Sequence, residues 1–238
     1  MALITSVISG MFGMAGGLIF LAVLTTTVET SYIVPLHAAF QLISNCSRLA
    51  FFFKHIRWVV IKYFVMGLIP GSLLGIFIFS YMPKGFIKLL IGFFILLATF
   101  LPETKREKRF DLVIFLPVGF ISGLLGIFVG ATGPISAPFF VRRDILKEDL
   151  IATKGTCQAI SHIVKIPLFG FVGANIFPYW KIILLVGPVI ILGTYVGKKL
   201  VGRISGRDFR LAFKIIISLI AVAIIIREIL PGVFFSRF

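Results

Sequence analysis

Two stretches of this chain carry polar side chains at identical helical spacing within otherwise apolar sequence. In each stretch four polar residues stand at positions i, i+4, i+7 and i+11, which places them along one side of a helix. Amide, hydroxyl and cationic groups of this kind donate hydrogen bonds and attract negative charge, so the pattern predicts a site for a small anion. The two stripes are His37, Gln41, Ser44 and Arg48, and Lys154, Gln158, Ser161 and Lys165.

The depth of these side chains decides how they can act. Eleven residues of helix rise about 16 Å, so each stripe runs from one side of a membrane towards its middle, and Gln41 and Gln158 lie deep. A single intramembrane glutamine is typical of a hydrogen bond between helices, whereas two at equivalent positions fit a ligand site equally well. Arg48 and Lys165 must reach an interface, pair with an acid or face an anion.

The acidic residues indicate the sign of the substrate. All of them lie at or near the ends of apolar segments, whereas carriers of cations generally hold a carboxylate inside the membrane. The interior offers positive charge, so we expect a negative substrate. His162 is a candidate proton carrier, with core and helix-joining roles as alternatives, and Asn45 stands at the matching position of the first stripe. The acidic residues are Glu29, Glu103, Glu107, Asp111, Asp144, Glu148, Asp149, Asp208 and Glu228.

Glycines break two of the apolar segments near the stripes. Residues 9–17 (SGMFGMAGG) and 122–138 (SGLLGIFVGATGPISAP) share the element S-G-x-x-G. A broken helix exposes backbone N–H groups and a positive dipole end, and glycine lets a ligand approach the backbone, so the two breaks together could form an anion site. Close helix packing is the alternative. It is the favoured interpretation of two further pairs, Gly71 with Gly75 and Gly193 with Gly197.

Composition indicates the class of protein. The chain has 238 residues, of which 59% are hydrophobic and 14% charged, and its mean hydropathy is +1.09. Several segments approach the roughly 20 apolar residues that cross a bilayer, so the expected fold is an all-α polytopic membrane protein. The net charge of +15 then reports the orientation of loops and not a nucleic-acid partner. The apolar segments are about residues 2–28, 34–53, 58–81, 85–101, 112–141, 149–171, 179–201 and 209–230.

The chain is expected to contain two copies of one unit. The glycine elements repeat at an offset of 113 residues, the polar stripes at 117 and the GxxxG pairs at 122. One wholly polar connector, PETKREKRFD, separates the copies. Residues 1–101 are therefore predicted to form the first transmembrane repeat, residues 102–111 a cytoplasmic linker and residues 112–238 the second transmembrane repeat.

The distribution of Lys and Arg distinguishes two topologies. If every apolar segment spans the membrane, basic residues divide almost equally between its sides. If each broken segment enters and leaves on one side, nearly all basic residues gather on that side, as the positive-inside rule favours. This re-entrant arrangement leaves three spanning helices per repeat, so the repeats must be inverted, with both termini facing away from the cytoplasm. The opposite side keeps Lys84, Lys88, Lys181, Arg227 and Arg237.

No catalytic signature stands out in the sequence. There is no HExxH motif and no pair of deep carboxylates, and Ser161 and His162 are neighbours that point about 100° apart on a helix. We therefore expect no enzyme, no cofactor and no metal site, and we interpret Cys46 and Cys157 as small core residues. The expected partners are a small anionic substrate and the lipid bilayer, with no nucleic acid; the oligomeric state stays open.

The repeated glycine elements also carry a resemblance to a known family. Together with the A-T-K-x-x-x-Q element of residues 152–158 and the late GxxxG of each half, they resemble the TauE/SafE family of sulfite exporters, also called the four-toluene-sulfonate uptake permease superfamily. The resemblance extends from about residue 10 to residue 225. It implies a multi-pass protein of the cell (inner) membrane that moves sulfite, sulfoacetate or other organosulfonates. The first copy departs from the family's Gly-Gly-Gly pattern with a following proline, since Ala15-Gly16-Gly17 has no early proline.

These observations lead to one hypothesis for the function. A secondary transporter would hold a small sulfur-containing anion, sulfite or an organosulfonate such as sulfoacetate, near the membrane midplane between the two glycine-rich breaks. The alternative is a transporter or channel for another small inorganic or carboxylate anion. Direction of transport and coupling ion stay open. The expected substrate-binding residues are Gly16, Gly17, Gln41, Ser44, Arg48, Gly130, Thr132, Gly133, Gln158, Ser161, His162 and Lys165.

Overall fold

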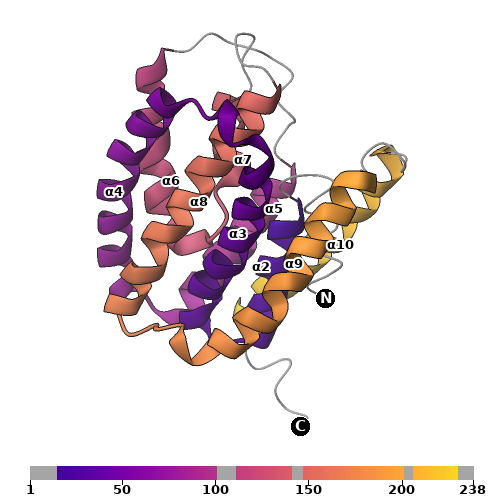
Figure 1. The fold of residues 1–238 in the computed structure, drawn as a ribbon. Coiled ribbons are helices and arrows are strands. Elements are labelled where there is room, and N and C mark those ends of the chain that lie inside the picture. Colours follow the sequence, from indigo (N-terminus) through magenta and orange to yellow (C-terminus); the bar gives the residue numbers. More distant parts are fainter. Residues whose placement is uncertain (1–14, 101–110, 141–146, 201–205, 230–238) are drawn as a thin grey trace.

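Helices form every regular element in the part of the chain that the computed structural model describes, which comprises residues 15–100, 111–140, 147–200 and 206–229 (Figure 1). The expected all-α class is confirmed for this part. The first half of the first broken segment falls in residues 1–14 and lies outside the described residues. In chain order the elements are α2 (Ala15–Thr27), α3 (Thr30–Phe52), η1 (Phe53–His55), α4 (Trp58–Ser80), α5 (Lys84–Phe100), η2 (Leu112–Ile114), α6 (Phe115–Val129), α7 (Gly133–Phe140), α8 (Lys147–Phe171), η3 (Phe177–Tyr179), α9 (Trp180–Leu200) and α10 (Gly206–Ile229).

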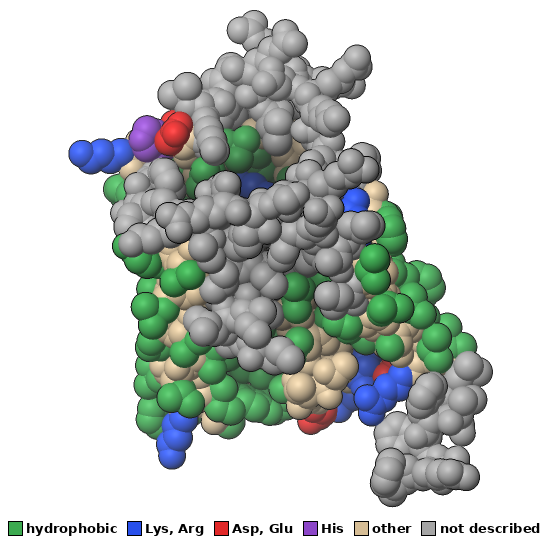
Figure 2. Space-filling model, turned by 90° about the vertical axis from the view of Figure 1, so that its right-hand side faces the viewer, with side chains coloured by type: hydrophobic (Ala, Val, Ile, Leu, Met, Phe, Trp, Pro, Cys, Tyr) green, Lys and Arg blue, Asp and Glu red, His purple; other side chains and the backbone are tan. Residues whose placement is uncertain are grey.

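Three helical stretches are long and apolar enough to cross a membrane. They are residues 58–80 in α4, 112–129 in η2 and α6, and 177–196 in η3 and α9. Many of their apolar side chains point outwards; Leu185 of α9, for example, is 76% exposed. Figure 2 shows hydrophobic side chains over much of the described surface on one face of the molecule. An apolar surface of this extent indicates contact with lipid, as expected of a membrane protein.

The two polar stripes meet inside the molecule because α3 and α8 pack against each other. His55, just after α3, contacts Asp149 in the first turn of α8. At the opposite end, the rings of Tyr32 in α3 and Tyr179 after α8 have centroids 5.2 Å apart. The two helices therefore run antiparallel. α4 packs on α8 and α9 packs on α3, so both helices are flanked by more apolar ones.

Glycines bring α4 and α6 into close contact. A Cβ atom at Gly67 would overlap the carbonyl oxygen of Leu116, and a Cβ at Gly71 would overlap that of Phe120. In the other direction, a Cβ at Gly119 would overlap the carbonyl oxygen of Phe64. Small residues allow two helix backbones to approach in this way, so Gly71 acts in close packing, the interpretation that the sequence favoured.

The second broken segment folds back towards its own beginning. α6 ends at Val129, and Gly130 follows with a φ of 71°, a left-handed conformation that glycine adopts readily. α7 then begins at Gly133 and ends at Phe140. The ring of Phe140 lies against that of Phe115, the first residue of α6, with centroids 4.9 Å apart. The sequence predicts a break within residues 122–138, and the structure places it at residues 130–132.

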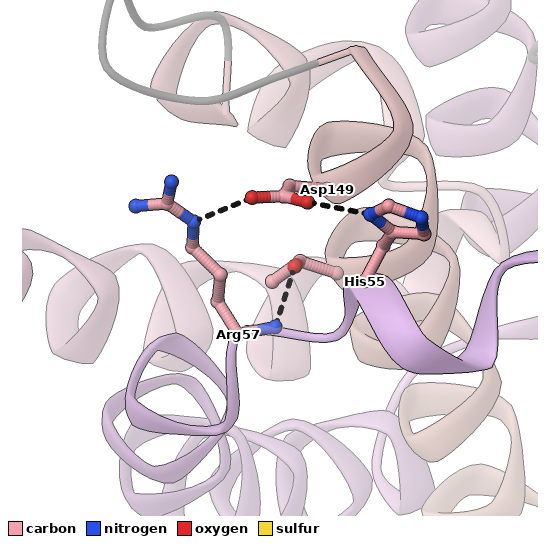
Figure 3. A network of polar contacts seen from close by, with 4 residues as sticks. His55, Arg57 and Asp149 are labelled. Atoms are coloured by element: carbon pink, nitrogen blue, oxygen red, sulfur yellow. Dashed lines mark hydrogen bonds and ion pairs between the residues drawn. The ribbon is translucent and has the colours of Figure 1, made fainter.

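A polar network joins the α3–α4 connection to the start of α8 (Figure 3). The Asp149 carboxylate accepts a hydrogen bond of 3.1 Å from Arg57 Nε and lies 3.0 Å from His55 Nδ1. The backbone N–H of Arg57 donates to the Thr153 hydroxyl at 3.0 Å. Hydrogen bonds from His55 and Arg57 lower the pKa of the Asp149 carboxyl below its usual range. The network holds two parts of the chain together at the end of the α3–α8 pair.

Candidate functional site

A small cavity lies where α3, α8, the start of α2 and the break between α6 and α7 meet. Its volume is about 30 Å³, which is room for about two buried water molecules. Residues of both polar stripes and of both glycine-rich breaks line it. The residues that line it are Gly17, His37, Gln41, Asn45, Ala131, Thr132, Gly133, Pro134, Gln158, Ser161, His162 and Lys165.

The α3 side of the cavity is formed by His37, Gln41 and Asn45. Their spacing of four residues keeps all three on one face of the helix. His37 is buried, and its Nε2 lies 3.1 Å from the carbonyl oxygen of Gly17. A carbonyl oxygen only accepts, so Nε2 carries the hydrogen and Nδ1 of the neutral ring keeps a free lone pair. That Nδ1 atom has no hydrogen-bond partner among the described residues.

The α8 side brings a cation into the interior. Lys165 has an exposed fraction of 0%, and its Nζ donates a hydrogen bond of 2.9 Å to the carbonyl oxygen of Gly130. A Cβ atom at Gly126 would lie 2.9 Å from this Nζ, so glycine leaves the room that the lysine side chain occupies along α6. The ammonium group is therefore held at the break itself.

Helix ends meet the cavity from two sides. Gly17 belongs to the first turn of α2, and Gly133 and Pro134 begin α7. The first N–H groups of a helix lack intrahelical partners, and the helix dipole adds partial positive charge at this end. Gln41 lies against the start of α2, where a Cβ at Gly17 would be 2.9 Å from its Nε2. Glycine thus permits the contact between the amide and the helix end.

The described lining of the cavity contains a positive charge, that of Lys165, and no negative charge. Lys165 and two histidines line it, and among the described residues no acidic side chain does. Where the structure shows ion pairs, the acids are Glu29, Asp149 and Glu228, which lie at helix ends. Within the described ranges no group of three or more His, Cys, Asp or Glu side chains could hold a metal ion. The cavity is therefore suited chemically to a negative ligand.

Most of the residues expected at the site surround this one cavity, and their role in anion binding stays a prediction. Ser44 instead faces α9, where its hydroxyl lies 3.5 Å from that of Thr194. Gly130 is the acceptor for Lys165, and Gly16 precedes Gly17 in α2. The side chain of Arg48 lies outside the described residues. The expected residues that line the cavity are Gly17, Gln41, Thr132, Gly133, Gln158, Ser161, His162 and Lys165.

Four lining residues were not among the expected site residues. His37 belongs to the first stripe, and Asn45 stands at the position that matches His162. Both lie four residues from Gln41, on the same face of the helix, so this spacing could have predicted both of them. Ala131 and Pro134 flank Thr132 and Gly133 in the break. Their position within the glycine-rich stretch of residues 122–138 could have predicted both.

Comparison with known protein families gives a match over most of the chain. Residues 1–224 match the model of the family described as sulfite exporter TauE/SafE. No curated protein and no solved structure matches the chain.

Proposed function

The chain belongs to the TauE/SafE family of sulfite exporters, and we propose that it is a secondary transporter for a small sulfur-containing anion in the cell (inner) membrane. Membership of this family implies a membrane transporter of sulfur anions such as sulfite. The finer proposal is that sulfite, or a small organosulfonate such as sulfoacetate, binds near the midplane in the cavity between α3, α8 and the glycine-rich breaks. Both amides of the stripes, Gln41 and Gln158, line that cavity.

The observation that carries the proposal is the buried ammonium group of Lys165. Burying a cation costs several kcal/mol unless it is paired. Within the described residues the structure shows one hydrogen bond from this group, to a neutral carbonyl oxygen, whereas an ammonium has three donors. An anion in the cavity would supply the missing charge. The helix ends of α2 and α7 would add N–H donors to it.

The proposal includes two inverted repeats, residues 1–101 and 112–238, joined by a cytoplasmic linker at residues 102–111. In this arrangement α3, α4 and α5 of the first repeat correspond to α8, α9 and α10 of the second. Helix contacts support it, because the packing of α4 on α8 has its counterpart in the packing of α9 on α3. The equivalent helices α3 and α8 also contact each other, as do α5 and α10. An axis that interchanges the repeats would generate this pattern. Equivalent helices that run antiparallel, as α3 and α8 do, favour an inverted relation over a parallel one.

The re-entrant topology also belongs to the proposal. Contact between the rings of Phe115 and Phe140 supports it, since a spanning segment would separate its two ends. At the end of the molecule that would face away from the cytoplasm, Lys84 pairs with Glu29 and Lys88 with Glu228. Lys84 and Lys88 are two of the five basic residues that this topology leaves on that side, whereas the positive-inside rule concerns the larger number of Lys and Arg expected on the cytoplasmic side.

The size of the cavity bears on the substrate. The cavity has room for about two water molecules, so each of the proposed anions needs it to widen, and a compact oxyanion needs less widening than a bulky organosulfonate. Another small inorganic anion would suit the same positively charged cavity. The substrate is therefore identified by comparing how strongly different anions bind.

A thermal-stability scan of the purified protein in detergent tests the proposal. Sulfite, thiosulfate, sulfate, sulfoacetate, acetate and chloride are compared as ligands. A ligand at 100 times its Kd stabilises the folded state by about 2.7 kcal/mol, and we expect this only with sulfur anions. Q41A/Q158A should lose the shift, whereas N175A, an amide in an exposed turn, should keep it. Stabilisation by none of the anions would overturn the proposal, and a larger shift with acetate or chloride would favour the alternative substrate class.

A further inference from the structure

Two buried histidines line the cavity beside Lys165. His37 and His162 are 1% and 5% exposed, and their ring centroids lie 6.0 Å apart with the rings nearly perpendicular. Nδ1 of each ring has no hydrogen-bond partner among the described residues. A buried ring nitrogen without a partner is costly, so these two atoms need an explanation.

The hydrogen bond to Gly17 determines the tautomer of the neutral His37 ring. Its Nε2 is the donor to the Gly17 carbonyl oxygen, so Nδ1 is the basic nitrogen of the neutral ring. A Cβ at Gly130 would lie 3.3 Å from that Nδ1, which places the nitrogen at the break beside the acceptor of Lys165. His37 can therefore take up a proton without losing its existing hydrogen bond.

We propose that His37 and His162 together bind one proton when an anion occupies the cavity, so that the transporter moves the anion and a proton in the same direction. The inference rests on the proposed function and adds the coupling ion to it. Hydronium from the aqueous side gives its proton to an Nδ1 lone pair and leaves as water. On the other side the imidazolium returns the proton to water as the anion departs.

Electrostatics of the site explains why proton and anion would bind together. Of the titratable side chains that the structure describes, only Lys165 and the two histidines line the cavity. α2, α6 and residues 130–132 contain no charged residue. The described charged residues of α5 and α9 do not line the cavity. The ammonium of Lys165 opposes a second positive charge on either imidazole. A bound anion cancels this repulsion, and by linkage the bound proton strengthens anion binding equally.

The pH dependence of anion affinity tests the inference. Histidine side chains ordinarily titrate between about pH 5 and about pH 8. Thiosulfate and sulfate are anions of strong acids and keep their charge in this range, so any change in their affinity belongs to the protein. We expect the Kd of the wild-type protein to fall up to about tenfold for each unit decrease in pH across part of this range, as uptake of one proton requires. H37Q/H162Q should bind with the same Kd throughout the range. The amide that H37Q introduces can still donate to the Gly17 carbonyl oxygen, which favours folding of the variant.

His55 provides the matched control. It lies outside the cavity and contacts Asp149, so H55Q should keep the wild-type pH dependence. Anion binding that is independent of pH in the wild type, or equally dependent in H37Q/H162Q, would overturn the proton site and leave the transporter proposal standing. Absence of binding by every anion at every pH would overturn both.

A flux measurement makes the test independent of the variant's folding. In liposomes that contain the wild-type protein and a pH-sensitive dye, an inward thiosulfate gradient should acidify the lumen. Thiosulfate entry without acidification would overturn the inference. Acidification that accompanies entry would support it, and H55Q should behave as the wild type does.

Discussion

Lys165 reaches across from α8 to the end of α6, where its Nζ donates a hydrogen bond to the carbonyl oxygen of Gly130. Gly130 is the residue at which the chain leaves α6 in a left-handed conformation. The contact therefore couples the polar stripe of one helix to the break in another. It places the buried cation next to the first residues of α7.

The first prediction concerns this cation. K165M removes the charge and keeps most of the side-chain volume, so the helices should still pack. A hydrogen bond to a charged group contributes about 1.5–3 kcal/mol, so anion affinity should fall about 10- to 100-fold in a binding titration. K181M, at the start of α9 beside Trp180, is the control with unchanged affinity. Wild-type affinity in K165M would contradict a role for the ammonium group in binding.

A second prediction separates two kinds of glycine in α6. G126A puts a Cβ against the end of the Lys165 side chain, whereas G119A puts one against the backbone of α4. We expect G126A to weaken anion binding with a small change in stability. G119A should lower the free energy of unfolding by about 1–3 kcal/mol through overpacking. Thermal melts and anion titrations of both variants check this, and a reversed pattern would contradict the assignment.

The polar network around Asp149 gives a prediction about pH. Its carboxyl pKa is lowered in the folded state from the ordinary value of 3.8, so its contribution to stability is present above that pH and is lost as pH falls through the lower, folded-state value. D149N should melt at a lower temperature than the wild type at neutral pH, and the difference should shrink at strongly acidic pH. E148Q, at the exposed neighbouring position, should melt as the wild type does. A difference that grows on acidification would contradict the account.

Thiol labelling tests the re-entrant topology. In a background without Cys46 and Cys157, single cysteines are introduced at the exposed positions Asp111, before α6, and Glu148, at the start of α8. A membrane-impermeant reagent should label both from the same side, because the segment between them returns to the side from which it entered.

Reference positions complete the labelling experiment. Tyr81 and Phe171 are both exposed at the other ends of α4 and α8, so cysteines there should react from the opposite side. Labelling of positions 111 and 148 from different sides would show a spanning segment and would contradict the re-entrant proposal.

Helix boundaries could be predicted closely from the sequence because apolar runs and their breakers determine them. The segment expected at 58–81 is α4, Trp58–Ser80, and that expected at 149–171 is α8, Lys147–Phe171. Glycines and Pro134 marked the break between α6 and α7. Local sequence determines each of these features, so no knowledge of the packing was needed.

The sequence could not show in the same way which side chains of a stripe point into the cavity. Steps of three and four residues turn a helix by about −60° and +40°, so Ser44 and Asn45 lie on opposite sides of Gln41. Packing against α9 turns Ser44 towards Thr194, and Asn45 lines the cavity instead. Only tertiary contacts make this choice. The contact of His37 with Gly17 depends likewise on how α2 packs on α3.

Uptake into liposomes that contain the purified protein tests the central claim most directly. Labelled sulfite and thiosulfate are offered outside vesicles preloaded with the same unlabelled anion. A secondary transporter should show saturable uptake, with a transient accumulation of label that is driven by exchange. Q41A/Q158A should abolish this uptake, whereas N175A should retain it. Uptake that rises linearly with concentration without exchange, or wild-type uptake in Q41A/Q158A, would contradict a carrier that works through this cavity.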